Sequence, residues 1–441
     1  MSRRNRKPLP VEPVRANIDS LAHDGRGVAH LNGKAIFIEG ALPGEDVLFV
    51  YRAQRRRYDE GAVVEIMSPS PERVTPCCPH FGVCGGCSLQ HVAPAAQIGM
   101  KEQVLVENLR RIGDVAAEEI MPPLTGPQWG YRRRARLGAK YVDKKQAMLV
   151  GFRERRNSYL ADLSRCEILH PAVGEHLPEL RALLGGLQSY RRIPQIEVAA
   201  GDDVVALVFR HLDPLPEVDR LTLRDFGERH GFYIYLQPGG PDSVAALWPE
   251  DPHLLYSLPA FDVTLEFLPT DFTQVNGVMN RSMVDQAMSL LAPGPQDRVL
   301  DLFCGLGNFT LPIARRAGSV VGVEGDAKLV QRARDNAVRN GIVNAEFHAA
   351  DLAAPDAPWS WLQDGFDKVL LDPPRTGALD VIRRIGPLQP PRVVYVSCNP
   401  ATFARDAAEL VHEHGYRLLR IGVMDMFPHT THVECMALFE T

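Results

Sequence analysis

A cysteine stands at the end of an apolar, β-branched run near the C-terminus, within Val393–Pro400. Such a run predicts a buried strand, and the Asn-Pro pair after Cys398 predicts a turn. In open α/β sheets, ligands bind at the carboxyl ends of the strands, so the thiol would stand where chemistry occurs. Because single cysteines are commonly buried structural residues, the role of Cys398 depends on what surrounds it.

A carboxylate follows in a second apolar run, where Glu434 lies within Val433–Phe439. Two interpretations are open for it. Glu434 is either an edge residue that faces water or a base that removes a proton from a substrate. A thiol and a base together are typical of covalent catalysis, in which the nucleophile adds to the substrate and later leaves.

A glycine-containing loop suggests what lies beside these two residues. Arg298–Phe303 is predicted to be a strand, and the loop Cys304-Gly305-Leu306-Gly307-Asn308 follows it. The glycines allow a ligand to approach the backbone, but the third glycine of the dinucleotide fingerprint is missing. A ligand without phosphates is therefore favoured.

Acidic residues end the next three predicted strands of this region. Glu324 comes 19 residues after Gly305 and is placed to accept hydrogen bonds from ribose hydroxyls. Asp351 ends the third strand and suits an adenine amino group, while Asp372-Pro-Pro-Arg375 ends the fourth in a rigid turn. Each acid alone could be a helix cap. Together with the glycine loop they predict an α/β, doubly wound, Rossmann-like methyltransferase domain that uses S-adenosylmethionine, from about Thr270 onward.

Three cysteines lie close together in a loop rich in glycine, and two further cysteines are also candidate ligands. The spacing from Cys78 through Cys84 to Cys87 is C-x5-C-x2-C; Cys77 competes with Cys78, and Cys166 is the nearest remaining thiol. Thiolates in this pattern bind zinc or an iron–sulfur cluster, and the number of ligands does not distinguish the two. The spacing differs from the C-x3-C-x2-C of radical enzymes.

The N-terminal part of the chain predicts a basic arm, residues 1–15, and then a small OB-like β-barrel, residues 16–68. Short alternating runs are separated by turn residues, of which Asn32-Gly33 is the clearest hairpin signal. Such barrels bind single-stranded nucleic acid or dock proteins. The arginines at 52 and 55–57, and ten basic against two acidic residues between Tyr131 and Arg156, favour RNA.

Length and composition indicate the general class of protein. A chain of 441 residues with 45% hydrophobic and 23% charged residues is typical of a globular protein with several domains. No run is long and apolar enough to cross a bilayer, so we expect a cytoplasmic protein without a membrane partner. The net charge of −5 makes the local basic clusters more informative than the total.

Taken together, the motifs resemble those of the RNA uracil-C5 methyltransferases that carry a TRAM domain, an RNA-binding barrel. The resemblance covers nearly the whole chain and rests on the barrel, the cysteines and five further stretches. These are Asp271–Asn276, Asp301–Asn308, Asp372–Arg375, Ser397–Pro400 and Phe427–Glu434.

The resemblance implies the site residues and cofactors. Four cysteines would hold a [4Fe–4S] cluster: Cys78, Cys84, Cys87 and Cys166. Six residues would line the S-adenosylmethionine pocket: Gln274, Phe303, Asn308, Glu324, Asp351 and Asp372. Relatives carry asparagine at the position of Asp351, so its partner is open. The central iron–sulfur and RNA-binding domain, for which the pattern predicts a mixed α/β fold, would be discontinuous, with residues 69–96 and 129–268. The methyltransferase domain would take residues 97–128 and 269–441.

The implied reaction needs both a thiol and a base. Uracil C5 is a poor nucleophile, so Cys398 would add to C6 and make C5 reactive toward the methyl group, and Glu434 would then remove the C5 proton. The expected substrate is 23S rRNA, most specifically uridine 1939, in a single-stranded or looped segment with the uracil flipped out. We expect a monomer.

Three alternatives remain at this point. The target could be another rRNA position or tRNA, although the tRNA enzymes lack the barrel. Methylation of cytosine C5 is a second possibility, but it usually uses a further cysteine in a Pro-Cys turn, where this chain has Asp372-Pro-Pro-Arg375. The third alternative is a non-catalytic RNA-binding protein.

Overall fold

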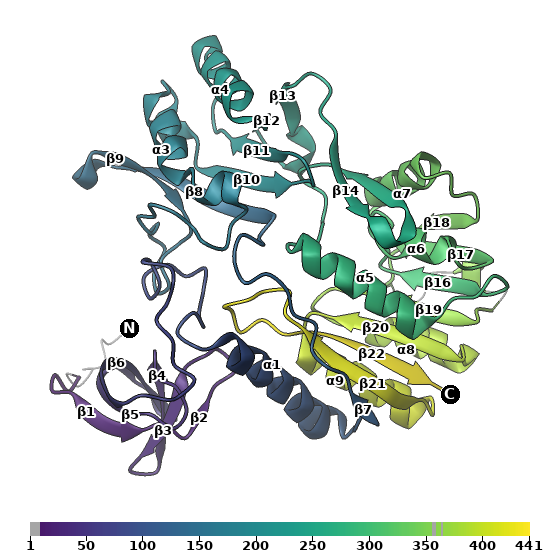
Figure 1. Ribbon diagram of the computed structural model, residues 1–441, viewed down its shortest axis with the longest axis horizontal. Coiled ribbons are helices and arrows are strands. Elements are labelled where there is room, and N and C mark those ends of the chain that lie inside the picture. The colour runs from purple at the N-terminus through teal and green to yellow at the C-terminus, as the bar shows by residue number, and fades with distance from the viewer. Residues whose placement is uncertain (1–8, 355–358, 363–364) are drawn as a thin grey trace, which may run out of the picture. The chain divides into compact units, whose positions relative to one another are not determined.

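The computed structural model describes residues 9–354, 359–362 and 365–441 (Figure 1). Residues 1–8 of the expected basic arm lie outside the described residues. The chain forms two compact units. The first contains the residues up to Met100 together with Glu154–Asn157 and Pro428–Thr431, and the second contains Lys101–Arg153, Ser158–Phe427 and His432–Thr441.

The first unit contains a six-stranded sheet in the order β1-β5-β6-β4-β3-β2. Its strands are β1 (Val14–Asn17), β2 (Ser20–Leu21), β3 (Gly27–Leu31), β4 (Lys34–Glu39), β5 (Asp46–Gln54) and β6 (Tyr58–Ser68). Alternate residues of β1, β3, β4 and β5 form one apolar cluster, against which Val63 and Ile66 of β6 pack. The strands predicted in this region are therefore confirmed.

The hairpin predicted at Asn32-Gly33 is present between β3 and β4. Both residues have positive φ angles, 52° and 75°, and Leu31 pairs with Lys34 across the turn. A two-residue turn of this kind matches the natural twist of the strands, which explains why the dipeptide identified it.

The second unit begins with a mixed sheet in the order β13-β12-β11-β10-β8-β9. Its strands are β8 (Arg134–Val142), β9 (Ala147–Gly151), β10 (Gln195–Ala200), β11 (Val205–Arg210), β12 (Phe232–Gln237) and β13 (Ala245–Trp248). The helices of this region are α2 (Pro171–Gly174), α3 (Leu177–Gly186) and α4 (Glu217–His230). Only β11 and β12 run parallel among these pairs of described strands, which makes this region mixed α/β as expected.

A second, larger sheet has the order β18-β17-β16-β19-β20-β22-β21-β7. Its strands are β7 (Glu119–Ile120), β16 (Arg298–Leu302), β17 (Ser319–Glu324), β18 (Ala345–Ala349), β19 (Lys368–Leu371), β20 (Arg392–Ser397), β21 (Arg417–Met424) and β22 (Glu434–Glu440). The five strands from β18 to β20 are parallel and β22 is antiparallel to both neighbours. The chain order reverses between β16 and β19, and ligands bind outside the carboxyl ends of strands at such a switch point.

Helices cover both faces of this sheet, as a doubly wound fold requires (Figure 1). Along β20, Val394 and Val396 belong to the cluster that contains α5 residues, whereas Tyr395 contacts Phe403 of α9. Successive side chains of a strand point to opposite faces. The helices are α5 (Gly277–Leu291), α6 (Thr310–Ala314), α7 (Ala327–Arg339), α8 (Leu379–Ile385) and α9 (Pro400–Ala408).

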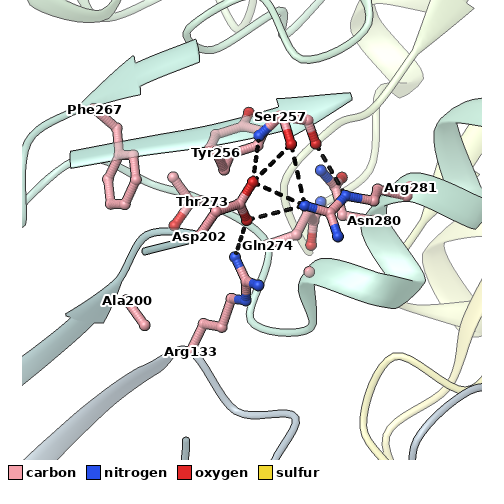
Figure 2. Close-up of a pocket in the computed structure, with 11 residues that line it drawn as sticks. Arg133, Ala200, Asp202, Tyr256, Ser257, Phe267, Thr273, Gln274, Asn280 and Arg281 are labelled. Carbon is pink, nitrogen blue, oxygen red and sulfur yellow. Dashed lines mark hydrogen bonds and ion pairs between the residues drawn. The ribbon is translucent and has the colours of Figure 1, made fainter. Parts of the chain in front are cut away.

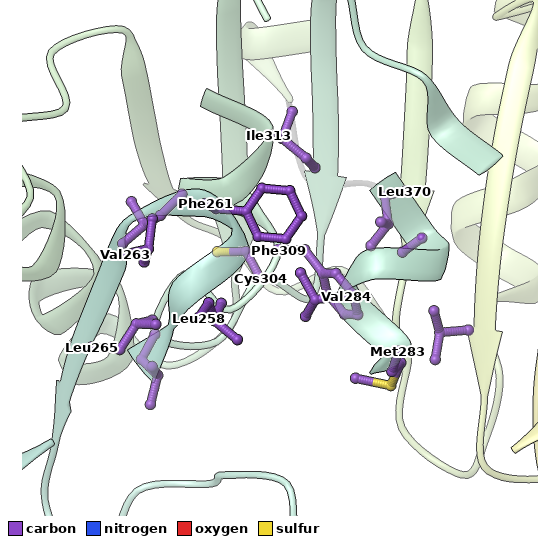
Figure 3. Packing of buried hydrophobic residues seen from close by; sticks show 14 of the residues in the cluster. Leu258, Phe261, Val263, Leu265, Met283, Val284, Cys304, Phe309, Ile313 and Leu370 are labelled. Carbon is purple, nitrogen blue, oxygen red and sulfur yellow. The ribbon is translucent and has the colours of Figure 1, made fainter. Parts of the chain in front are cut away.

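The principal core of the second unit lies between α5, α6 and a separate hairpin (Figure 3). This hairpin consists of β14 (Leu254–Leu258) and β15 (Val263–Phe267). Its Leu258 and Leu265 are buried in the same cluster as Phe309 and Met283. The hairpin therefore fixes α5 and the residues after β16, where the predicted donor pocket begins.

Upstream lies α1 (Pro94–Asn108), which is extended by a π-helical turn, η1 (Leu109–Gly113). Shorter helical turns of the second unit are η2 (Asp143–Lys145), η3 (Tyr190–Arg192), η4 (Pro241–Ser243), η5 (Pro259–Phe261), η6 (Ser360–Leu362), η7 (Gly386–Leu388) and η8 (Glu409–Glu413). No helix in the described part of the chain is long and apolar enough to cross a membrane.

Candidate active site

Cys398 lies directly after β20, in the turn that begins α9. Asn399 caps this helix, because its side-chain oxygen accepts the Ala401 N–H at 3.1 Å. Its amide nitrogen also donates to the Arg375 carbonyl at 3.0 Å. The turn that carries the thiol is thus held against the Asp-Pro-Pro-Arg turn after β19, as the shared sheet edge predicts.

Glu434 begins β22, the strand beside β20, and the neighbouring pair is Ser397 with Cys435. Glu434 is only 8% exposed. The His432 Nε2 atom lies 3.0 Å from Glu434 Oε1, and Arg375 Nη2 lies 3.1 Å from His432 Nδ1. Because arginine only donates, His432 Nδ1 accepts and Nε2–H donates to the carboxylate.

Charges in this site act on one another. Burial, followed by the carboxylates of Glu434 and Asp372, raises the pKa of the Cys398 thiol to about 11, while Arg375 opposes the shift. Burial also raises the pKa of Glu434, against the lowering influence of His432, Arg375 and Lys101. Burial is again the main reason that the pKa of Asp372 lies well above its usual range. Cys398, Glu434 and Asp372 therefore form one electrostatically coupled group.

The loop after β16 forms the neighbouring part of the site. Glu324, at the end of β17, accepts backbone N–H bonds from Gly305 at 3.1 Å and Gly325 at 2.7 Å. Phe303 has a φ of 66°, which is strained for a residue other than glycine. Residues held in such a conformation cluster at ligand sites, where the surrounding structure imposes it.

Further hydrogen bonds position Asn308. Its amide forms a reciprocal pair with the amide of Asn280 in α5, with both distances 2.9 Å, and Tyr256 Oη donates to Asn308 Oδ1 at 3.0 Å. Gln274 lines the same pocket as Asn280 and Tyr256.

The other side of this pocket is an ion network centred on Asp202 (Figure 2). Arg133 Nη1 lies 2.6 Å from the carboxylate, Arg281 Nη2 lies 2.9 Å from it, and Ser257 donates both its N–H and its hydroxyl. The network ties the mixed sheet to α5 and to the β14–β15 hairpin. It therefore fixes the wall of the pocket that Gln274 lines.

Asp301 in β16 is fully buried beneath the glycine loop. Burial raises the pKa of its carboxyl to about 7, although a hydrogen bond from the Thr310 hydroxyl opposes the shift. Among the described residues, its Oδ1 atom has no hydrogen-bond partner. Asp351, by contrast, is exposed, follows β18 by two residues and accepts the N–H of Ala353 at 2.9 Å.

The three cysteines of the N-terminal loop are held by backbone turns. Phe81 N–H donates to the Cys78 carbonyl at 3.1 Å, and Gly86 N–H lies 3.4 Å from Cys84 Sγ. Burial raises the pKa of the Cys84 thiol, the Gly86 N–H lowers it, and the neighbouring Cys78 adds a smaller raising effect. In the described ranges, no three His, Cys, Asp or Glu side chains are arranged closely enough to hold a metal ion. The thiol donors and the amide beside Cys84 nevertheless have the chemistry that suits an iron–sulfur cluster or zinc.

Much of the basic stretch after Tyr131 has structural partners. Arg133 pairs with Asp202 and Arg136 with Glu197. Arg134 donates to the carbonyls of Pro269 and Asp271. Charge counting along the sequence overstated the cationic surface offered to RNA by this stretch.

Several residues of the site were not singled out from the sequence. Tyr256, Asn280 and His432 contact predicted site residues through hydrogen bonds. Tyr256 and Asn280 lie outside the motifs, so no signal in the sequence identified them. His432 lies inside the motif Phe427–Glu434, and its spacing of two residues from Glu434 was the available signal.

Comparisons with known proteins agree with this geometry. Residues 294–437 match the family model described as "Methyltransferase domain". The chain is 55% identical over 439 residues to the "23S rRNA (uracil(1939)-C(5))-methyltransferase RlmD" of Methylococcus capsulatus, covering 99% of each chain. The chain belongs to the RlmD family. An RlmD of Alkalilimnicola ehrlichii is also 55% identical, over 99% of this chain and 98% of its own.

A solved structure supports the fold of the RlmD family member described here. The Pyrococcus abyssi tRNA (uracil-54, C5)-methyltransferase in complex with S-adenosyl-L-homocysteine matches with a TM-score of 0.73. The match covers 97% of this chain and 100% of that structure at 24% identity. It therefore includes the strands of the first unit, and the expectation that the tRNA enzymes lack this part of the chain is wrong for that protein. The α/β methyltransferase fold is therefore confirmed.

Proposed function

We propose that the protein forms 5-methyluridine in 23S rRNA, at the uridine named in its relatives, with S-adenosylmethionine as the methyl donor. The observation that carries this proposal is the placement of Cys398 and Glu434 at the ends of neighbouring strands, coupled to Asp372. A nucleophile and a base on one edge of a methyltransferase sheet are what methylation of a ring carbon requires.

In the first step, the thiolate of Cys398 forms a bond to C6 of the flipped uracil. The C5–C6 double-bond electrons move toward O4, so C5 becomes nucleophilic. The donor supplies an electrophilic methyl group on a sulfonium, which C5 takes in an in-line displacement. Because neighbouring carboxylates and burial disfavour the free thiolate, its negative charge gains stability by passing into the uracil ring.

In the second step, the Glu434 carboxylate removes the proton from C5. The electrons of the C–H bond restore the C5–C6 double bond, the C6–S bond breaks, and Cys398 leaves as a thiolate. The His432 N–H bond to Glu434 orients the carboxylate and stabilises its ionised form before proton transfer. Proton removal by a positioned group of this kind typically contributes a factor of about 10² to 10⁴.

The donor pocket is proposed to consist of the six residues implied by the family motifs: Gln274, Phe303, Asn308, Glu324, Asp351 and Asp372. The Glu324 carboxylate accepts the Gly305 N–H of the glycine loop through one oxygen and the Asp326 N–H after β17 through the other, so it is ordered beside that loop. Asn308 is hydrogen-bonded to Asn280, and Gln274 lines the pocket that Asn280 and Tyr256 also line.

A [4Fe–4S] cluster on Cys78, Cys84, Cys87 and Cys166 is proposed as a structural cofactor. The soft thiol donors support this assignment, as does the Gly86 N–H directed at Cys84 Sγ, because such hydrogen bonds stabilise cluster sulfurs. No step of the methyl transfer depends on it. The TRAM barrel and a monomeric state are proposed on the same family resemblance.

The proposed function is tested with Cys398→Ala. This variant should bind S-adenosylhomocysteine and RNA as the wild type does, yet form no 5-methyluridine, because the ring is no longer activated. Wild-type protein should become covalently attached to 5-fluorouridine RNA, since fluorine at C5 cannot leave as a proton. Full methylation by Cys398→Ala would contradict the mechanism, and no saturable S-adenosylhomocysteine binding in calorimetry would favour a non-catalytic RNA-binding protein.

A further inference from the structure

Lys101 of α1 forms a buried ion pair that the reaction above does not use. Lys101 is 2% exposed, and its Nζ atom lies 2.7 Å from Asp425 Oδ1 and 2.9 Å from the Phe427 carbonyl oxygen. Asp425 is equally buried. Burial of two charges costs several kcal/mol for each ion and often exceeds the attraction gained, so stability alone is a weak reason for this pair.

The position of the pair connects it to the active site. Asp425 directly follows Met424, the last residue of β21, and Met424 pairs with Glu434, the first residue of β22. Directly opposed residues of antiparallel strands have Cα atoms about 4.5–5.5 Å apart. Lys101 therefore holds the end of the same strand pair from which Glu434 extends.

The charge of Lys101 also reaches Glu434. Burial raises the pKa of the Glu434 carboxyl, and Lys101 is one of the groups, after His432 and Arg375, whose charge lowers it. Burial lowers the pKa of Lys101 itself, while Asp425 and Glu434 raise it. Other charged or titratable groups also interact electrostatically with Glu434. They are Asp372 after β19, Cys398 after β20, Arg375, His432 and Cys435. Of the two basic side chains Arg375 and Lys101, Arg375 is exposed whereas Lys101 is buried.

We propose that Lys101 is a positioning residue for the general base: through Asp425 and the Phe427 carbonyl it fixes the strand end that presents Glu434, and its charge favours the carboxylate over the carboxylic acid. The inference rests on the proposed role of Glu434. Lys101 itself contacts neither the RNA nor the donor in this account.

The test replaces Lys101 with methionine, which removes the charge and keeps much of the side-chain volume. Single-turnover reactions with RNA tritiated at uracil C5 measure tritium release against pH, and denaturing gels measure the covalent enzyme–RNA adduct. We expect tritium release at neutral pH to fall about tenfold and the acidic limb of its pH profile to move up by about one unit, because loss of a cation raises the pKa of the base. The adduct should accumulate, and S-adenosylhomocysteine binding should be unchanged.

Three further variants separate this role from simple loss of stability. Lys101→Arg keeps the charge and should restore the acidic limb. The double variant Lys101→Met with Asp425→Asn leaves no unpaired buried carboxylate, so it should regain stability while the limb stays displaced. Lys368→Met breaks a less buried ion pair, with Asp297, at the amino ends of β19 and β16, and it should leave the limb in place.

The outcomes distinguish the two proposals. A wild-type acidic limb and no adduct in both Lys101→Met and the double variant would overturn the role of Lys101 alone. An equal displacement of the limb by Lys368→Met would overturn it as well, because the effect would then follow any broken ion pair. Absence of tritium release and of 5-methyluridine from the wild type would overturn the proposed function together with this inference.

Discussion

At the scale of single residues, the surroundings of Cys398 disfavour the thiolate that the first step requires. Burial, Glu434 and Asp372 all raise the pKa of the Cys398 thiol, which at about 11 leaves only a small thiolate fraction at neutral pH. Below that pKa, each increase of one pH unit raises the thiolate fraction about tenfold. The same carboxylate that disfavours the thiolate is the proposed base, so the two steps place conflicting demands on Glu434.

This conflict predicts the behaviour of Glu434→Gln. Removal of the charge should lower the pKa of Cys398 and speed addition to C6, while loss of the base should slow proton removal by at least about 100-fold. A methylated covalent adduct with ordinary RNA should therefore accumulate, as measured on denaturing gels with labelled RNA. Glu440→Gln, at the opposite end of β22 and paired with Arg392, serves as the matched control. Normal turnover by Glu434→Gln would show that another group removes the proton.

At the scale of elements, α9 fixes where the thiol stands. Asp406 in α9 is fully buried and accepts hydrogen bonds from Tyr395 Oη of β20 at 2.7 Å and from Ala378 N–H before α8 at 2.6 Å. Arg405 donates to its other oxygen at 2.6 Å. One carboxylate thus joins the strand that precedes Cys398, the helix that follows it and the segment after Arg375.

We predict that Asp406→Ala lowers the free energy of unfolding by about 2–4 kcal/mol, because Tyr395 Oη and the Ala378 N–H would lose a charged partner inside the protein. Denaturant unfolding measures this change. Tyr395→Phe removes only one of the donors and should cost about 1 kcal/mol. The exposed Asp380 of α8 is the control, since Asp380→Ala should change stability by less than about 0.5 kcal/mol. A similar effect of Asp406→Ala and Asp380→Ala would contradict the anchoring role.

At the scale of the whole molecule, the thiol and the base of the proposed chemistry lie within the second compact unit. Three of the four proposed cluster ligands, Cys78, Cys84 and Cys87, belong to the first unit, and Cys166 belongs to the second. The proposed cluster is therefore expected to affect folding and RNA binding rather than the methyl-transfer chemistry itself.

Replacement of a proposed ligand tests the cluster. Cys84→Ser, prepared without oxygen, should lose most of its iron and acid-labile sulfide and unfold at a lower temperature, because serine is a poor ligand for iron–sulfur clusters. Its binding of S-adenosylhomocysteine should remain. Cys77→Ser is the matched control, because Cys77 is exposed and is not a proposed ligand. Zinc without iron in the wild type, or full iron content in Cys84→Ser, would overturn the assignment.

The sequence alone was sufficient to predict the strands and their ends, because their signals are local. Val393–Ser397 and Lys368–Leu371 are apolar runs that stop at turn residues, and the glycine loop follows its strand directly. The motif residues at these ends could accordingly be predicted to share one edge of the sheet.

Only the tertiary structure decided what surrounds those residues. Lys101 lies 333 positions before Glu434 in the chain and reads locally as one polar residue of an amphipathic helix, yet it is buried against the strand pair that carries Glu434. Likewise, the arginines after Tyr131 predict a cationic surface, but Asp202 and Glu197 neutralise two of them. The physical reason is that burial and the partner of a charge depend on contacts between distant segments, and charge and periodicity along the chain contain no record of those contacts.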